Sequence, residues 1–184
     1  TCMKIIFPDS KRATYMDSKH VYGMDICFDL QDVYAALTEI CNLRFELQGH
    51  LQKEIRHLLK VDKSYVYLDV TNTYMEMDFS REGTLPQKGV SKGHKTEPII
   101  QMGLLLDSNG MPLLHECFPG NTSDTLVLQP MVEQVRKSGM TTGRIIVVAD
   151  KGLNSGKNID YLCNDGNGYV FSQILKGKKG SRYH

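Results

Sequence analysis

The stretch that decides the fold reads YVYLDVTN at residues 65–72. A second stretch, IIVVAD at residues 145–150, is again an apolar run that ends on an aspartate. Such runs predict strands that are apolar on both faces and sit centrally in a covered, mostly parallel sheet. Because sites in sheets with crossover helices gather at the carboxyl ends of the strands, Asp69 and Asp150 are the first candidates for chemistry.

Three further strands are predicted outward from this pair. Residues 99–106 and 112–118 are joined by the hairpin signal Asp-Ser-Asn-Gly at 107–110, and residues 169–172 follow a Gly-Asn-Gly turn. Three antiparallel strands followed by crossover units describe an α/β fold with a ribonuclease-H-like mixed five-stranded sheet and flanking helices.

Two helices are predicted to connect these strands. One runs from about Asp124 to Lys137, and Thr122, Ser123 or Asp124 can cap its start. The other runs from Ser155 to Leu162 and leads to the last strand. In this topology the first and fourth strands are parallel neighbours about 4.8 Å apart, which brings their two aspartates close together.

The segment before the core is predicted to be helical. Residues 1–20 are polar and irregular, whereas residues 29–60 carry apolar side chains at three- and four-residue steps, as a helix with one buried stripe would. Gly49 is expected to break this helix. We therefore divide the chain into a helical segment over residues 1–63 and a core domain over residues 64–184.

Two neighbouring carboxylates repel each other unless a cation neutralises them. Hard oxygen ligands suit Mg²⁺ or Mn²⁺, and a pair of such ions can activate an attacking oxygen and stabilise a leaving one in phosphodiester cleavage. A strand-terminal aspartate is also a common turn former, so Asp150 by itself fits either role. Asp69 favours the metal role, because Val70 continues the strand beyond it.

Four short motifs follow one another along the chain: LDVTN at 68–72, KGVSKGH at 88–94, FPGNTSD at 118–124 and VADKGLNS at 148–155. From about Tyr22 to Ser172 the chain resembles bacterial DDE-type insertion-sequence transposases, in particular the insertion-sequence-four group and its relatives. The resemblance implies a ribonuclease-H-like catalytic domain in which Asp69 and Asp150 are two of three metal-binding carboxylates. It also implies two Mg²⁺ ions in the complete enzyme, with Mn²⁺ as a substitute.

The resemblance further implies a reaction and its partners. Enzymes of this family nick DNA at transposon ends with water and then use the freed 3′-hydroxyl to attack target DNA. They work as a dimer or a larger synapse. We therefore expect metal-dependent DNA cleavage and strand transfer, with transposon ends and target DNA as partners and a homodimer in the synaptic complex.

The third carboxylate of the family is missing from this chain. It is a glutamate on a later helix, within a Tyr-x-x-Arg-x-x-x-Glu pattern, and no glutamate follows Glu133 here. Only Asp160 and Asp165 are acidic after the second aspartate, and Asp160 falls on the wrong element. We expect the catalytic domain over residues 64–184 to stop before the third carboxylate, and the chain alone to be inactive or nearly so.

A basic loop is the candidate contact for DNA. Lys88, Lys92, His94 and Lys95 lie in a segment without acids that can hold phosphates, although a solvated hairpin tip would have the same composition. Lys151, directly after the second aspartate, can meet a phosphate or offset local negative charge. A second basic run at residues 176–182 is assigned to a disordered end rather than to DNA.

Residues beside the aspartates are assigned supporting roles. Thr71 and Asn72 can orient the first metal ligand or its water through hydrogen bonds, or cap the strand end. Asn121, Ser123 and Asp124 fit helix capping first, and the family motif adds a role near the active site. The histidines outside the basic loop show no metal-ligand spacing.

Composition excludes several classes of protein. The 184 residues are 41% hydrophobic and 23% charged, with a net charge of +1, so attraction to DNA must come from local patches. No apolar run approaches the roughly 18 residues of a membrane span, and no secretory signal is present. The five scattered cysteines form no CxxC pair and are expected to be buried, inert thiols in a reducing cytoplasm.

Two other functions share these features. Another ribonuclease-H-like nuclease would have the same aspartates without the FPGNTSD motif. A non-catalytic transposase remnant that only binds DNA or dimerises would lack the third carboxylate. A nucleotide-binding domain is disfavoured, because no glycine-rich phosphate loop follows the first strand.

Overall fold

The computed structural model describes residues 2–23, 25–58, 65–77, 82–89, 97–140 and 143–173. By its internal contacts the chain divides into two units, Thr1–Leu47 and Gln48–His184. The predicted boundary between residues 63 and 64 stays a prediction. The two units are described separately below.

The first unit begins with two short helices, α1 (Cys2–Ile6) and α2 (Lys11–Ser18). The irregular conformation expected for the first 20 residues is therefore wrong. Helix α2 forms because Ser10 caps it, with the backbone N–H of Ala13 donating to the Ser10 hydroxyl at 3.1 Å. Such caps are worth about 1 kcal/mol, which is enough to start a short polar helix.

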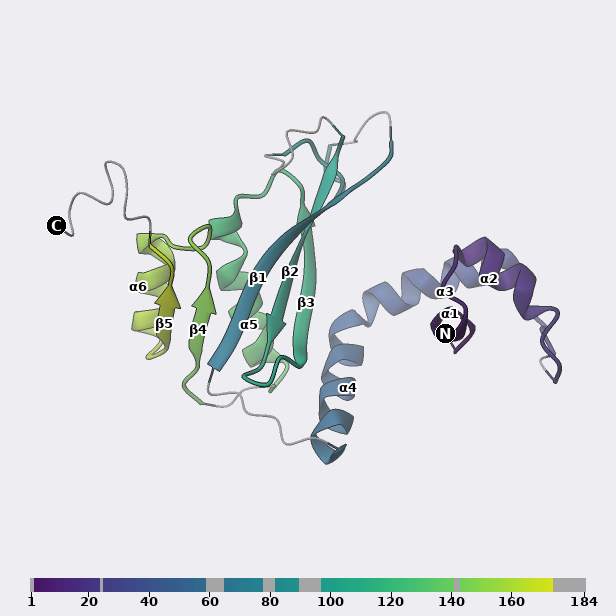
Figure 1. Ribbon diagram of the computed structural model, residues 1–184, viewed down its shortest axis with the longest axis horizontal. Coiled ribbons are helices and arrows are strands. Elements are labelled where there is room, and N and C mark those ends of the chain that lie inside the picture. The colour runs from purple at the N-terminus through teal and green to yellow at the C-terminus, as the bar shows by residue number, and fades with distance from the viewer. Residues whose placement is uncertain are drawn as a thin grey trace. The chain divides into compact units, whose positions relative to one another are not determined.

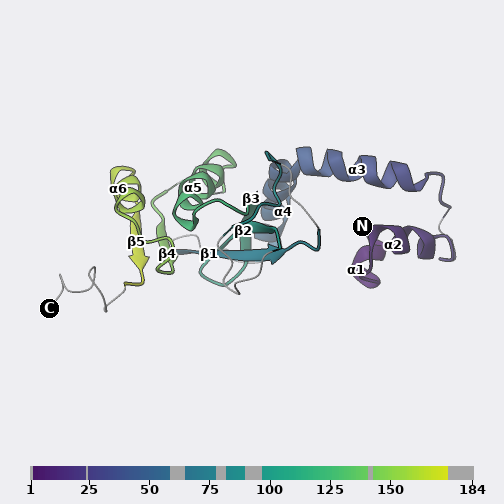
Figure 2. The same cartoon turned by 90° about the horizontal axis from the view of Figure 1, so that it is seen from above.

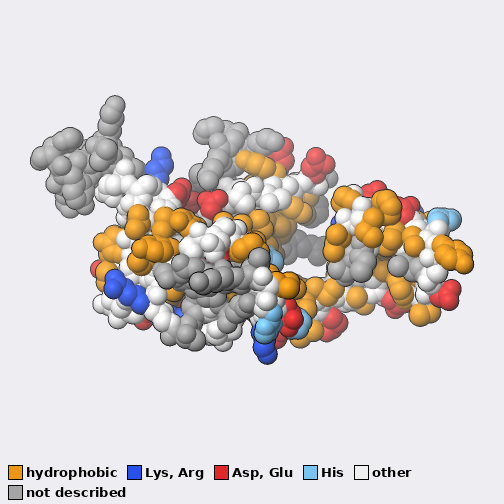
Figure 3. All heavy atoms as spheres, turned by 60° about the horizontal axis from the view of Figure 1, so that its bottom comes forward, with side chains coloured by type: hydrophobic (Ala, Val, Ile, Leu, Met, Phe, Trp, Pro, Cys, Tyr) orange, Lys and Arg blue, Asp and Glu red, His pale blue; other side chains and the backbone are white. Residues whose placement is uncertain are grey.

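Helix α3 (Leu30–Asn42) starts with a capping box. The N–H of Asp32 donates to the Asp29 carboxylate and the N–H of Asp29 donates to the Asp32 carboxylate, each at 2.9 Å. The buried stripe predicted here is wrong, because no residue of α3 is buried. Tyr34 and Ile40 are about half exposed, and hydrophobic side chains lie at the surface of both units (Figure 3).

Helix α4 (Arg44–Leu58) runs through Gly49 without a break, so the break predicted at that glycine is wrong. The helices are interrupted at Leu43, whose φ of −91° and ψ of 12° end α3. Glycine in a helix costs about 1 kcal/mol relative to alanine, which weakens a helix but does not end it when its neighbours continue the pattern.

The second unit is built on a five-stranded sheet. Its strands are β1 (Tyr65–Tyr74), β2 (Ile99–Leu106), β3 (Pro112–Pro119), β4 (Ile146–Ala149) and β5 (Gly168–Phe171). They lie in the order β3-β2-β1-β4-β5, with β1, β2 and β3 antiparallel and with β4 and β5 parallel to β1. This strand order confirms the α/β fold with a ribonuclease-H-like mixed sheet.

The hairpin between β2 and β3 forms as predicted. Asp107 Oδ1 accepts hydrogen bonds from the N–H groups of Asn109 at 2.9 Å and Met111 at 2.8 Å. Gly110 supplies the positive φ of 79° that the turn requires. The carboxylate therefore takes the place of a strand partner and reverses the chain.

The connections after β3 are helical and lie on one face of the sheet. They are the short 3₁₀ helix η1 (Asp124–Leu126), α5 (Leu128–Lys137) and α6 (Gly156–Asn164). Helices α5 and α6 are on the same side of the sheet in both views (Figures 1 and 2). Between the sheet and α5 lies the core, in which Val66 and Met131 are fully buried.

The other face of β1 is not covered within the described residues. Residues of β1 alternate between buried and exposed, and Tyr65 and Tyr67 are 45% and 43% exposed. The expectation that this strand is covered on both faces is therefore wrong. Tyrosine tolerates such a position because its hydroxyl can reach water while its ring covers the sheet.

Helix α4 covers the edge strand β3. The side-chain oxygen of Gln48 accepts a hydrogen bond from the backbone N–H of His115 at 2.7 Å, and the buried Gln52 amide donates to the carbonyl of Pro112. One turn of helix separates the two glutamines, so both reach the same strand. An edge strand has unpaired backbone groups, and the two amides satisfy two of them.

The cysteines differ from their prediction. Cys27, Cys41, Cys117 and Cys163 are exposed and form no disulfide, so the expectation of buried thiols is wrong for all four. Cys41 is exposed because nothing buries α3, and Cys117 points from the uncovered face of β3. In the part of the chain that the structure describes, no helix has the length and apolar character to cross a membrane.

Candidate metal centre at Asp69 and Asp150

The strand register brings Asp69 and Asp150 together. Strands β1 and β4 are parallel, and their last paired residues are Leu68 and Ala149. Asp69 is the next residue on β1, and Asp150 is the first residue beyond β4. Parallel neighbours lie about 4.8 Å apart, so the exposed Asp69 within β1 and the exposed Asp150 directly after β4 lie at the same level of adjacent strands.

Asp150 opens a tight turn. Its Oδ1 accepts a hydrogen bond from the N–H of Gly152 at 2.8 Å, and its carbonyl accepts from the N–H of Leu153 at 3.3 Å. The interpretation of Asp150 as a turn former is therefore correct, and it leaves the second carboxylate oxygen available for a ligand. The Asp69 carboxylate makes no hydrogen bond to any other described residue.

A buried asparagine anchors the loop that follows Asp150. Asn158 is 1% exposed, and its side-chain amide donates to the carbonyls of Leu153 at 2.8 Å and Thr125 at 3.0 Å. Ser155 caps α6 as predicted, with the N–H of Asn158 donating to its hydroxyl at 3.3 Å. Sequence reasoning missed Asn158, because its partners are distant in the chain and no motif marks them.

Asp124 takes a different role from the one its sequence suggested. The side chain of Ser123 makes no capping hydrogen bond, and α5 begins at Leu128 after a separate 3₁₀ turn. The Asp124 Oδ1 atom instead accepts a hydrogen bond from the side-chain amide of Gln101 at 2.9 Å. Gln101 is 4% exposed and was not singled out from the sequence, where it is one polar residue in an apolar strand.

The two strand-end carboxylates suit a divalent cation in their chemistry. Asp69 and Asp150 provide hard oxygen donors, and Mg²⁺ is commonly held by one or two carboxylates together with water and substrate oxygens. Among the described residues, no group of three His, Cys, Asp or Glu side chains is placed to hold a metal ion. The pair therefore fits a site that is partly filled by water or by a phosphate.

The two polar residues after Asp69 point to different sides of the sheet. Thr71 lies on the exposed face of β1 together with Asp69. Asn72 lies on the opposite face and pairs across the strands with Gln101. The structure therefore brings Thr71, but not Asn72, to the Asp69 side of the sheet.

The basic loop is described only in part. Lys88 and Lys151 are exposed, whereas Lys92, His94, Lys95 and the basic run at residues 176–182 lie outside the described residues. The segment before Lys88 is held by paired hydrogen bonds between the backbones of Gln87 and Ile99, at 2.9 and 3.0 Å. This fixes the start of the loop beside β2.

Two glycines allow that segment to approach the sheet. A Cβ atom on Gly120 would lie 2.0 Å from the carbonyl oxygen of Ile99, and one on Gly89 would lie 1.8 Å from the carbonyl oxygen of Gly120. Real Cβ atoms do not approach so closely, so both positions require glycine. The FPGNTSD motif thus has a packing role at Gly120.

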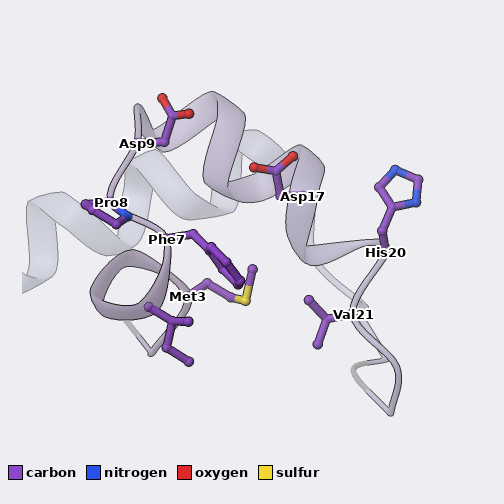
Figure 4. Close-up of a pocket in the computed structure, with 8 residues that line it drawn as sticks. Met3, Phe7, Pro8, Asp9, Asp17, His20 and Val21 are labelled. Carbon is purple, nitrogen blue, oxygen red and sulfur yellow. The ribbon is translucent and has the colours of Figure 1, made fainter.

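A pocket of about 510 Å³ lies in the first unit rather than at the aspartates. Eight residues line it: Met3, Ile6, Phe7, Pro8, Asp9, Asp17, His20 and Val21. Figure 4 shows Met3 and Phe7 side by side, with the His20 ring directed away from them. The lining is mostly apolar and offers no metal-ligand arrangement, so the strand-end pair remains the candidate centre.

Three solved structures to which the chain is similar are transposase structures. The Mos1 transposase paired-end complex with left transposon end aligns at a TM-score of 0.41 and 12% identity, covering 92% of this chain and 56% of that one. The catalytic domain of Mos1 mariner transposase aligns at 0.38 and 12%, covering 69% and 58%. The Mos1 mariner paired end complex with Mn aligns at 0.40 and 11%, covering 91% and 52%.

The chain thus spans a little over half the length of these transposases. No protein-family model matches the chain, and no curated protein matches its sequence. Because these TM-scores are below 0.5, the fold is assigned from the strand order of the sheet alone.

Proposed function

We propose that this chain is the catalytic region of a DDE-type transposase, related to the insertion-sequence-four group, that cleaves and joins DNA with a divalent metal ion. One observation supports the proposal, namely the parallel register that ends at Leu68 and Ala149, the residues directly before Asp69 and Asp150. The four sequence motifs support it independently, because two of them contain these aspartates.

In this proposal Asp69 and Asp150 hold Mg²⁺, with Mn²⁺ as a substitute and two ions in the complete enzyme. Bound there, the metal would activate an attacking oxygen and neutralise charge on the phosphate. The chain itself contributes the placement of its groups: the Gly152 N–H holds one oxygen of Asp150, and Thr71 lies on the Asp69 face, where its hydroxyl can orient a water.

The proposed partner is DNA, as transposon ends and as target, in the cytoplasm and within a homodimeric synaptic complex. Lys88 and Lys151 are exposed and can meet DNA phosphates, and Lys92, His94 and Lys95 follow Lys88 in the same basic loop of the sequence. Phosphate contacts of this kind position DNA without reading its sequence.

A second candidate function is a non-catalytic one. Within the described residues, no three acidic, histidine or cysteine side chains come together for a metal. We therefore propose that cleavage by this chain alone is weak or absent. A non-catalytic role in DNA binding or dimerisation is the alternative.

Metal binding and cleavage test these functions separately. Mn²⁺ titration followed by electron paramagnetic resonance is expected to show binding that Asp69→Asn and Asp150→Asn each weaken at least about tenfold. Asp160→Asn, an exposed acid on α6, is the matched control and should bind as the wild type does. Equal Mn²⁺ binding by the wild type and all three variants would contradict the proposed metal centre.

Cleavage assays then separate the nucleases from the binding protein. The protein should bind duplex DNA that carries the transposon ends, and it should nick this DNA at a rate near background. Robust nicking that Asp69→Asn abolishes would contradict the predicted inactivity and retain the metal centre. Cleavage of an RNA–DNA hybrid in preference to end DNA would favour another ribonuclease-H-like nuclease.

A further inference from the structure

Asp124 approaches Asp150 across a glycine. A Cβ atom built on Gly152 would lie 3.0 Å from Asp124 Oδ2 and 3.1 Å from Asp150 Oδ1. Both oxygens are close to one point, so they are no more than about 6 Å apart, a distance at which two like charges repel appreciably. Neither carboxylate forms an ion pair within the described residues.

Gln101 holds Asp124 in this position from the covered side of the sheet. Gln101 shares a face of β2 with Gly103, whose Cβ position lies 3.0 Å from Val127 and 3.3 Å from Met131. Its amide N–H donates to Asp124 Oδ1, which leaves Oδ2 directed toward Gly152. A carboxylate with one oxygen fixed and the other presented is the usual state of an oriented metal ligand.

The same glutamine has an unsatisfied acceptor. Gln101 is only 4% exposed, and its Oε1 atom has no hydrogen-bond partner among the described residues. Buried polar atoms normally have a partner, so an orphan acceptor in the amide that binds Asp124 indicates that a water or an ion belongs beside it. This observation is independent of the two acids.

We propose that Asp124 is a further carboxylate for the divalent cation held at Asp150, acting through one metal-bound water, with Gln101 as its positioning residue. The inference rests on the proposed function, because it takes Asp150 as a metal ligand. Asp124 is bound by Gln101 from the covered face of the sheet, whereas Asp69 lies on the exposed face. A side chain at position 152 would crowd both oxygens, because its Cβ would lie 3.0 Å from Asp124 Oδ2 and 3.1 Å from Asp150 Oδ1.

Mn²⁺ titration of the full chain tests the assignment with conservative variants. Asp124→Asn keeps an oxygen for the Gln101 hydrogen bond and removes only the charge, so the metal-free melting temperature should not fall. The dissociation constant for Mn²⁺ should rise about tenfold. Asp124→Glu restores the charge and should recover part of the lost affinity, and Gln101→Met should weaken binding through the disoriented carboxylate.

The outcomes separate this inference from the proposed function. If Asp150→Asn weakens Mn²⁺ binding but Asp124→Asn binds as the control Asp160→Asn does, Asp124 is no ligand and the metal centre stands without it. If neither Asp150→Asn nor Asp124→Asn changes binding, the metal centre itself is wrong. Weaker binding by Asp124→Asn without rescue by Asp124→Glu would show a packing role and overturn the inference.

Discussion

Asp69 and Asp150 directly follow Leu68 and Ala149, the last paired residues of the parallel strands β1 and β4. Asp69 remains within its strand, whereas Asp150 turns back through the Gly152 N–H. One carboxylate is therefore placed by the sheet and the other by a loop. The stability of that loop decides how well the Asp150 carboxylate is held.

Asn158 anchors the loop that follows Asp150, so its loss should lower both the stability and the Mn²⁺ affinity of the protein. Asn158→Ala removes both hydrogen bonds from a buried amide and leaves the carbonyls of Leu153 and Thr125 without that donor. The free energy of unfolding should fall by about 1–3 kcal/mol, and Mn²⁺ binding should weaken as the Asp150 turn loosens. Urea denaturation followed by circular dichroism measures the first effect.

The control for this variant is Asn164→Ala, which changes an exposed asparagine on the same helix. An exposed substitution of this kind should alter stability by no more than about 0.5 kcal/mol. If the two alanine variants unfold at the same urea concentration, Asn158 does not anchor the loop.

Gly120 should be intolerant of a side chain. In Gly120→Ala the new Cβ would meet the carbonyl oxygens of Ile99 at 2.0 Å and Gln87 at 2.6 Å, so the backbones must separate. We expect a loss of stability of at least about 1–3 kcal/mol, together with weaker DNA binding as the Lys88 segment moves. Gly49→Ala is the matched control, since nothing lies within 4 Å of its Cβ position.

Alanine should instead favour helix α4 at position 49, by about 0.5–1 kcal/mol. The two glycine variants are therefore predicted to shift the melting temperature in opposite directions. A Gly120→Ala protein as stable as the wild type would show that the close approach of the three backbones is not required.

The exposed lysines are predicted to bind phosphate rather than bases. Lys88→Ala and Lys151→Ala should each weaken duplex DNA binding to a similar degree for all sequences. Each should also reduce the slope of log affinity against log salt by about 1. Fluorescence anisotropy at several salt concentrations measures this, with Lys53→Ala on α4 as the control. A salt slope equal to that of the control would exclude the lysine from the DNA contact.

The sheet could be predicted from sequence because its signals are local. Strand β2 begins and ends where predicted, since the apolar run stops at the Asp107–Gly110 hairpin. The covered face could not be predicted, because the alternation of β1 depends on which side α5 and α6 cross. Tyr65 and Tyr67 are compatible with either a covered or an open face.

The candidate site could be predicted only where one strand carries its residue. Asp69 and Asp150 were predicted as a metal site from two apolar runs that carry an aspartate, and the strand order makes β1 and β4 neighbours as expected. The contact of Gln101 with Asp124 joins a central strand to the turn after β3, and no periodic pattern in the sequence predicts it. Capping was the better local interpretation of Asp124, and a tertiary hydrogen bond replaced it.

A crystal of the chain soaked in Mn²⁺ tests the central claim most directly. Anomalous scattering locates manganese independently of any assumption about its ligands. We expect a manganese peak between the carboxylates of Asp69 and Asp150, with metal–oxygen distances of roughly 2–2.3 Å, which are typical of this class of ion. Manganese bound elsewhere, with both aspartates free of metal at saturating concentration, would contradict it.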